Sequence, residues 1–191
     1  MKTKAVFLFV IAVTIACLHS NVDAVTDFRI AGIEARSAYV SVEGPVHEAI
    51  AWGGSVNLGN INTNTYLRVD LLYWQQTYFR PPYPDYPFEY KYDYKDLATK
   101  INILYTIPRK RIIPYIGGGF TIHKYTWIVT NSTGHHWPDD TETRLGFQVF
   151  GGAQYKLPYN FYCFVEAAFD RSDRDQILAG GGLGYNIKWF N

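Results

Sequence analysis

The feature that most constrains this chain is a two-residue alternation of apolar and polar side chains, repeated in eight runs of ten or more residues. Turn residues separate the runs, so each is read as a β-strand. Most runs exceed the roughly 5–6 residues usual for a soluble strand and suit the roughly 9–11 that a tilted strand needs to cross a membrane. They lie near residues 28–42, 49–58, 65–79, 94–106, 112–127, 142–156, 161–171 and 176–189. The pattern predicts an all-β fold.

Each run has one apolar face and one polar face. The third shows this best, with Leu67, Val69 and Leu71 on one side and Arg68 and Asp70 on the other. A soluble lipocalin-type barrel turns the apolar face inward, whereas a membrane barrel turns it outward toward lipid, and alternation fits both. In the membrane arrangement the charged face fills the interior. The residues predicted to form that polar network are Arg68, Asp70, Lys100, Arg144, Glu166, Asp170 and Lys188.

Connection lengths favour the membrane arrangement. If the first strand starts in the periplasm, the outward connections are Glu43–Glu48, Arg80–Asp93, Ile128–Thr141 and Ser172–Asp175, and two of them are long and polar. The inward connections are short and lie at Gly59–Asn64, Ile107–Arg111 and Leu157–Asn160. Short periplasmic turns with longer external loops are typical of outer-membrane barrels. The sequence therefore predicts an eight-stranded antiparallel up-and-down transmembrane β-barrel.

Aromatic residues are abundant, with 16 Tyr, 12 Phe and 5 Trp in 191 residues. Several fall at the ends of the runs on the predicted lipid face, where rings favour the headgroup level of a membrane. Ordinary strand-end tyrosines of a soluble barrel are the alternative, because sheets enrich aromatics anyway. The predicted aromatic girdle consists of Tyr73, Tyr105, Tyr115, Tyr125, Tyr155, Phe161, Phe169 and Trp189.

The first 24 residues are predicted to be a secretory signal peptide. Lys2 and Lys4 precede the apolar run 5–17, which is too short for a membrane-spanning helix, and Val22-Asp23-Ala24 offers a small-residue cleavage site. We expect cleavage after Ala24; lipidation of Cys17 is the alternative. One cysteine, Cys163, then remains, so the predicted mature domain, residues 25–191, has no internal disulfide.

Two segments carry a resemblance to a known family. They are 111–120, Arg-Ile-Ile-Pro-Tyr-Ile-Gly-Gly-Gly-Phe, and the last run, 178–189, Leu-Ala-Gly-Gly-Gly-Leu-Gly-Tyr-Asn-Ile-Lys-Trp. On these motifs residues 25–191 resemble the small eight-stranded outer-membrane β-barrels of the OmpA, OmpX and OmpW kind. The resemblance implies an outer-membrane location, outer-membrane lipid as a partner, and folding by the barrel-assembly machinery. That machinery reads a terminal aromatic residue, which here is displaced because the chain ends Phe190-Asn191.

No cluster in the sequence points firmly to a reaction. Glu166 and Asp170, four apart on one strand, lie roughly 13 Å from each other, too far to cooperate directly as acid and base. His123 is placed on the lipid face with Tyr125, and a lipid deacylase of this fold needs a serine close to such a histidine. The loop cluster His135, His136, Asp139, Asp140 and Glu142 matches no established metal spacing, so neither a metal nor a cofactor is predicted.

The segment Arg80–Asp93 is the most unusual stretch, since it combines four prolines with rigid aromatic contact residues. Either it binds something outside the cell or it packs its own rings over the barrel mouth. The candidate binding residues are Tyr83, Tyr86, Phe88, Tyr90 and Tyr92.

The predicted function is a structural or surface-interaction role in a bacterial outer membrane, without catalysis. A net charge of +1 gives no electrostatic case for nucleic acid. The alternatives are a narrow channel through the interior, a lipid-modifying barrel enzyme and a secreted lipocalin-like binder.

Overall fold

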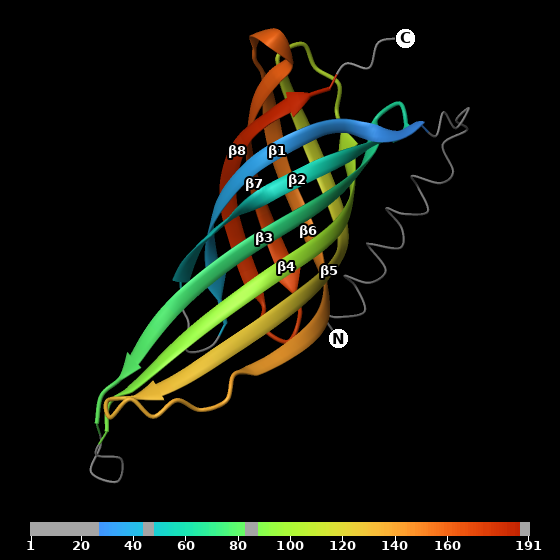
Figure 1. Cartoon of the computed structure of the whole chain (residues 1–191). Coiled ribbons are helices and arrows are strands. Elements are labelled where there is room, and N and C mark those ends of the chain that lie inside the picture. The colour runs from blue at the N-terminus through green and yellow to red at the C-terminus, as the bar shows by residue number, and fades with distance from the viewer. Residues whose placement is uncertain (1–26, 44–47, 83–87, 188–191) are drawn as a thin grey trace, which may run out of the picture.

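A computed structural model describes residues 27–43, 48–82 and 88–187, and the predicted signal peptide lies outside these ranges. The described chain is built almost entirely from eight long strands (Figure 1). They are β1 (Asp27–Val42), β2 (Glu48–Asn62), β3 (Thr65–Arg80), β4 (Tyr90–Thr106), β5 (Ile112–Asn131), β6 (Asp140–Lys156), β7 (Phe161–Arg171) and β8 (Gln176–Asn186). One 3₁₀ turn, Pro158–Asn160, precedes β7. No helix in the described part of the chain is long and apolar enough to cross a membrane.

The strands form a closed barrel in which each one pairs antiparallel with its neighbour in sequence, and β8 returns to pair with β1. This is the predicted all-β up-and-down topology. Three connections lie at one end of the barrel, here named the turn end, where β1 begins and β8 ends. They join β2 to β3, β4 to β5 and β6 to β7, at residues 63–64, 107–111 and 157–160. The other four connections lie at the opposite end, named the loop end.

The barrel is inside out relative to a soluble protein. On β4, Ile101 and Ile103 point outward with exposed fractions of 49% and 44%, while Lys100 and Asn102, which alternate with them, are buried. Leu145 on β6 is 76% exposed, and Gln148 on the same strand is buried. The predicted faces of the third, fourth, sixth and seventh runs are therefore correct: aliphatic side chains cover the outside and charges fill the inside.

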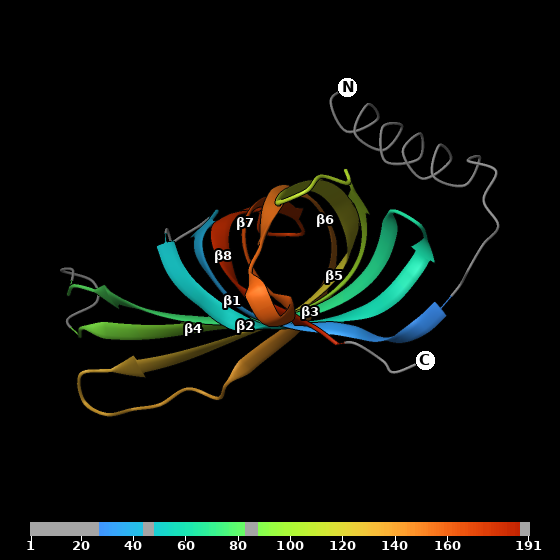
Figure 2. The same cartoon turned by 90° about the horizontal axis from the view of Figure 1, so that it is seen from above.

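Three strands continue past the barrel at the loop end. β3 pairs with β4 as far as Arg80↔Tyr90, but in the described chain β2 accompanies β3 only to Ala51↔Trp74. β5 follows β4 out to Asn131. Residues 75–80, 90–95 and 126–131 thus form a three-stranded extension, the protruding sheet, which leaves the barrel wall at an angle in both views (Figures 1 and 2).

This extension corrects two predicted loops. Arg80–Asp93 was expected to be an external loop, but Tyr90 and Tyr92 belong to β4; Ile128–Thr141 was expected to be another, but β5 runs to Asn131. Around Tyr90 and Tyr92 tyrosines alternate with charged residues, and Ile128 and Val129 are consecutive apolar residues, so neither segment shows the aliphatic alternation that marks the other strands.

Inward glycines make room for large rings in the interior. A Cβ at Gly184 of β8 would clash with the ring of Tyr162, and one at Gly117 of β5 would clash with the ring of Phe150. Both rings are buried. Glycine at these two positions therefore makes room for the rings that crowd the interior of a small barrel.

Candidate functional site

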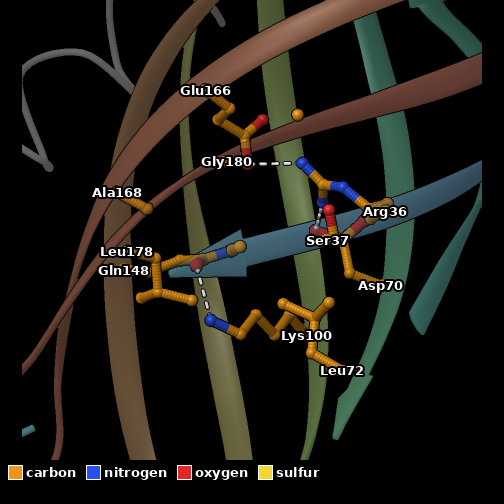
Figure 3. Close-up of a pocket in the computed structure, with 12 residues that line it drawn as sticks. Arg36, Ser37, Asp70, Leu72, Lys100, Gln148, Glu166, Ala168, Leu178 and Gly180 are labelled. Carbon is orange, nitrogen blue, oxygen red and sulfur yellow. Dashed lines mark hydrogen bonds and ion pairs between the residues drawn. The ribbon is translucent and has the colours of Figure 1, made fainter. Parts of the chain in front are cut away.

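Two regions have the residues to carry a function: the charged interior and the loop end. The interior begins, nearest the turn end, with a group that we name the arginine layer: Glu34 and Arg36 of β1, Arg68 and Asp70 of β3, and Glu166 of β7. Arg36 Nη1 lies 2.8 Å from Asp70 Oδ2, and Arg68 Nη2 lies 2.9 Å from Glu166 Oε2. Arg36 also pairs with Glu166 (Figure 3).

Aromatic rings complete the arginine layer. The Tyr115 hydroxyl donates to Glu166 at 2.9 Å, and the Tyr162 hydroxyl donates to Glu34 at 2.8 Å. The Arg68 guanidinium carbon lies 4.8 Å from the ring centroid of Phe150. Each buried charge thus has an opposite charge, a hydroxyl or a ring face against it, which is what a charge removed from water requires.

A second group, the histidine layer, lies closer to the loop end. Lys100 Nζ is 2.7 Å from Asp170 Oδ2. His123 is fully buried between two carboxylates, with Nδ1 2.8 Å from Asp96 Oδ2 and Nε2 3.3 Å from Asp170 Oδ2. Gln176 donates to Asp96 at 3.1 Å. The layer draws on β4, β5, β7 and β8, so it ties opposite walls of the barrel together.

Amide side chains join the two layers. Gln148 donates to Asn102 at 2.7 Å, Asn102 donates to Asp70 at 2.8 Å, and Lys100 donates to Gln148 at 3.0 Å. Beside this junction a cavity of about 20 Å³ is lined by Arg36, Asp70, Lys100, Gln148 and Glu166, among others (Figure 3). That is room for about one water molecule. The interior is therefore a packed lattice of ion pairs and hydrogen bonds.

We expect this lattice to block ion flow. Both layers span the lumen, and moving them aside means separating buried ion pairs. Planar-bilayer recordings of the purified chain should show little or no steady conductance. Large, stable openings would contradict the packed interior and favour a channel.

The structure places five of the seven predicted interior residues in the lattice: Arg68, Asp70, Lys100, Glu166 and Asp170. Arg144 does not belong to it, because β7 pairs with β6 only as far as Phe147↔Arg171 and does not extend alongside Arg144. Its side chain is 41% exposed at the rim, where it pairs with Glu142 and Asp173. Lys188 lies outside the described residues.

Sequence reasoning missed several members of the lattice. Glu34, Arg36 and Asp96 alternate along their strands with outward-facing apolar residues, so period-two alternation could have identified them as inward-facing. His123 was wrongly placed on the lipid face. Aromatic residues occur on both faces of β5, so alternation did not show which face points inward. In the structure Ile116, Phe120 and Ile122 point outward.

The same phase error affects the predicted girdle. Tyr115 and Tyr125 are 1% and 3% exposed and point into the barrel, because their hydroxyls reach polar partners there: Glu166 for Tyr115, Ser172 and Gln176 for Tyr125. Trp189 lies outside the described residues. The outward positions on the barrel are held by Tyr73, Tyr105, Tyr155, Phe161 and Phe169.

The protruding sheet carries a row of aromatic side chains on the face that continues the barrel interior. We name this row the aromatic stripe; it comprises Tyr78, Tyr90, Tyr92, Tyr94 and Trp127 of these strands, with Trp137 of the connection between β5 and β6 packed against Tyr90. The ring centroids of Tyr92 and Tyr94 are 6.4 Å apart, those of Tyr90 and Tyr92 are 6.5 Å apart, and those of Tyr90 and Trp137 are 5.9 Å apart.

The candidate loop residues divide between this stripe and its surroundings. Tyr90 and Tyr92 lie in the stripe, on β4 rather than in a loop. Phe88 precedes β4 and is 40% exposed. Tyr83 and Tyr86 lie outside the described residues.

The polar groups near the loop end do not assemble a recognisable reactive centre. His136 Nε2 lies 3.1 Å from Asp139 Oδ1, but no group of three or more metal-ligating side chains is arranged to hold an ion within the described chain. Ser172 bonds to Tyr125 and to the carbonyl of Arg174, while His123 contacts carboxylates in the interior. The histidine and serine of a lipid deacylase are thus not brought together on the outer surface.

Comparison with known proteins identifies the fold. No family model matches the chain, and no curated protein matches it in sequence. Among solved structures, Neisserial surface protein A aligns with a TM-score of 0.59 at 13% identity, over 83% of this chain and 98% of that one. The N-terminal β-barrel domain of Pseudomonas aeruginosa OprF aligns at 0.54 with 15% identity, over 82% and 98%.

A third similar structure is Ail, the attachment invasion locus protein of Yersinia pestis, with a TM-score of 0.52 and 12% identity over 82% of this chain and 99% of that one. These likenesses confirm the predicted fold class: the chain has the fold of the small eight-stranded outer-membrane β-barrels.

Proposed function

We propose that this chain is a bacterial outer-membrane protein that binds a partner outside the cell through its protruding sheet, and that it performs no catalysis. The protruding sheet is the observation that carries the proposal, because the aromatic stripe runs along it with Tyr78 and Trp137 exposed and the other rings half-buried. A purely structural barrel needs strands only as long as the membrane is thick, whereas β3, β4 and β5 continue beyond the barrel wall.

The outward surface supports the membrane location. Tyr105, Tyr155 and Phe161 lie toward the turn end, and Tyr73 and Phe169 toward the loop end, with aliphatic side chains between them. Such a band suits outer-membrane lipid as the partner of the barrel wall. The loop end then faces outward, since long connections are external in this fold. Export with cleavage after Ala24 and insertion by the barrel-assembly machinery belong to the same proposal.

The division of labour within the molecule supports a binding role. Side chains on the barrel are committed either to lipid or to the interior lattice, so few are free to recognise a partner. Recognition in proteins concentrates on exposed segments held by a rigid scaffold. Tyr and Trp are suited to this work because they give large contact areas with few rotatable bonds.

The test is adherence of bacteria that display the chain to a surface coated with basement-membrane matrix. Because Thr77 pairs directly with Asp93, residues 78–92 can be replaced by Asn-Gly, which closes a two-residue hairpin in the same register. We expect this shortened variant to fold, to keep heat-modifiable gel mobility, and to adhere no better than bacteria lacking the protein.

The matched control replaces only residues 83–87 with Gly-Ser, which leaves Tyr78, Tyr90 and Tyr92 in place. It should adhere like the unmodified chain. Undiminished adherence of the shortened, correctly folded variant would refute the proposal and return the protein to a structural role.

A further inference from the structure

Arg174, in the hairpin between β7 and β8, lies at the foot of the aromatic stripe. Its guanidinium carbon is 5.6 Å from the ring centroid of Tyr94, 5.5 Å from that of Tyr125 and 6.0 Å from that of Trp127. Three rings from two strands thus surround one half-buried cation at the barrel mouth, which fixes its position.

The ionic surroundings of Arg174 differ from those of the interior cations and of Arg144, its neighbour at the rim. Arg36, Arg68, Lys100 and Arg144 each have a carboxylate within ion-pair distance. No described carboxylate forms such a pair with Arg174, and the adjacent Asp173 turns to Arg144 instead. Arginine binds carboxylates through charge-assisted, often paired hydrogen bonds. Arg174 therefore offers a positioned, unused binding group for an anion.

The stripe above Arg174 indicates what should carry that anion. Tyr94 belongs both to the ring cage and to the stripe, which continues outward through Tyr92 and Tyr90 to Trp137. Tyrosine combines a flat apolar ring with a hydroxyl. A sugar ring has the matching character, with a C–H face and a rim of hydroxyls.

On the other face of the protruding sheet, Lys91 pairs with Asp93 at 2.8 Å, and Lys95 lies two positions further along the same strand. The rings of the stripe are uncharged, Arg174 lies at their base, and Arg80, which pairs in register with Tyr90, lies at the outer end of the same face. This arrangement favours a chain of mostly uncharged groups ending in, or interrupted by, a carboxylate over a uniformly acidic peptide, which would need several cations.

We propose that the aromatic stripe and Arg174 form one binding site for an oligosaccharide containing a carboxylate-bearing sugar. The carboxylate pairs with Arg174, and neighbouring sugars lie against Tyr94, Tyr92 and Tyr90. This inference rests on the proposed surface-binding function and specifies the ligand class of the same site.

The experiment measures binding of the full chain, reconstituted in lipid nanodiscs, to three acidic oligosaccharides: oligogalacturonate, hyaluronan and polysialic acid. Each is compared with its methyl ester, which keeps the sugars and removes the charge. At least one acid should bind at least about tenfold more tightly than its ester, because only the acid offers Arg174 a charged acceptor.

Variants then assign the site. Arg174→Gln should weaken the acid by about tenfold and abolish the preference over the ester, while Arg174→Lys should keep part of it. Tyr92→Ala should weaken acid and ester alike, because it removes contact area and leaves the charge. Arg109→Gln, in an exposed connection at the turn end, is the matched control and should change nothing.

Three results would overturn the inference. They are failure of all three acids to bind, equal binding of acid and ester, and tight Arg174-dependent binding of an oligoglutamate peptide in place of the sugars. Any of them is compatible with matrix adherence that still requires residues 78–92. The ligand class and the surface-binding function can therefore fail separately.

Discussion

Replacing Arg68 with methionine is expected to lower the free energy of unfolding by about 3–5 kcal/mol, because Arg36 is then the one remaining counter-charge in the arginine layer for three buried carboxylates, Glu34, Asp70 and Glu166. Arg68 is completely buried, with Glu166 at 2.9 Å and Asp70 at 2.8 Å. Methionine keeps most of the side-chain length, so the loss of charge dominates over a cavity. Urea unfolding in lipid vesicles, followed by tryptophan fluorescence, measures the effect.

A second substitution separates charge from packing. Glu166→Gln in the Arg68→Met background removes one of the excess buried carboxylates and should recover a substantial part of the stability. In a double-mutant cycle, the two substitutions together should therefore cost less than the sum of their separate costs. Arg109→Met, on the exposed connection at the turn end, should stay within about 0.5 kcal/mol of the original. If Arg68→Met behaves like Arg109→Met, the interior is solvated and the arginine layer does not stabilise the barrel.

The barrel itself could be predicted because period-two alternation reports directly on two different environments. Where one face is aliphatic and the other charged, as on β3 and β4, the phase is fixed by a few residues such as Val69 and Asp70. β5 lacks that contrast. Its inward face carries Tyr115, Thr121, His123 and Tyr125, so aromatic character appears on both sides and the phase could not be assigned.

The partners within the lattice could not be predicted because they lie far apart in sequence. Arg36 pairs with Glu166 across 130 positions, and Lys100 pairs with Asp170 across 70. Alternation predicts only that both side chains point inward. The height at which each lies depends on the stagger between strands around the closed barrel, which no local pattern contains.

The protruding sheet was missed for a different reason. Prolines and tyrosines in Arg80–Asp93 indicate a loop by composition, yet backbone pairing continues to Arg80↔Tyr90. Pairing beyond the barrel needs no lipid-facing aliphatic residues, because both faces leave the membrane. The feature on which the proposed function depends is thus the one that membrane patterning cannot signal.

The orientation of the barrel wall makes a second strong prediction: Val69→Arg should lower the free energy of unfolding by about 2–4 kcal/mol. Val69 points outward on β3 and pairs with Ile101 on β4. Tyr73 lies four positions further along β3, and Tyr105 lies four positions further along β4 in the opposite direction. Val69 is therefore midway between the two aromatic levels, where a charge is furthest from water.

Depth supplies the control for this substitution. Gln75 also points outward on β3, two positions beyond Tyr73 toward the loop end, and Gln75→Arg places the same charge outside the aromatic levels. The cost of an arginine falls to about 0–1 kcal/mol near the interface. Both variants are compared by unfolding in the same vesicles, so the difference between their free energies of unfolding measures the cost of placing the charge in the hydrocarbon region. Equal stability of the two variants would mean that the aliphatic wall does not face lipid, and the barrel would then have to be explained as a soluble one.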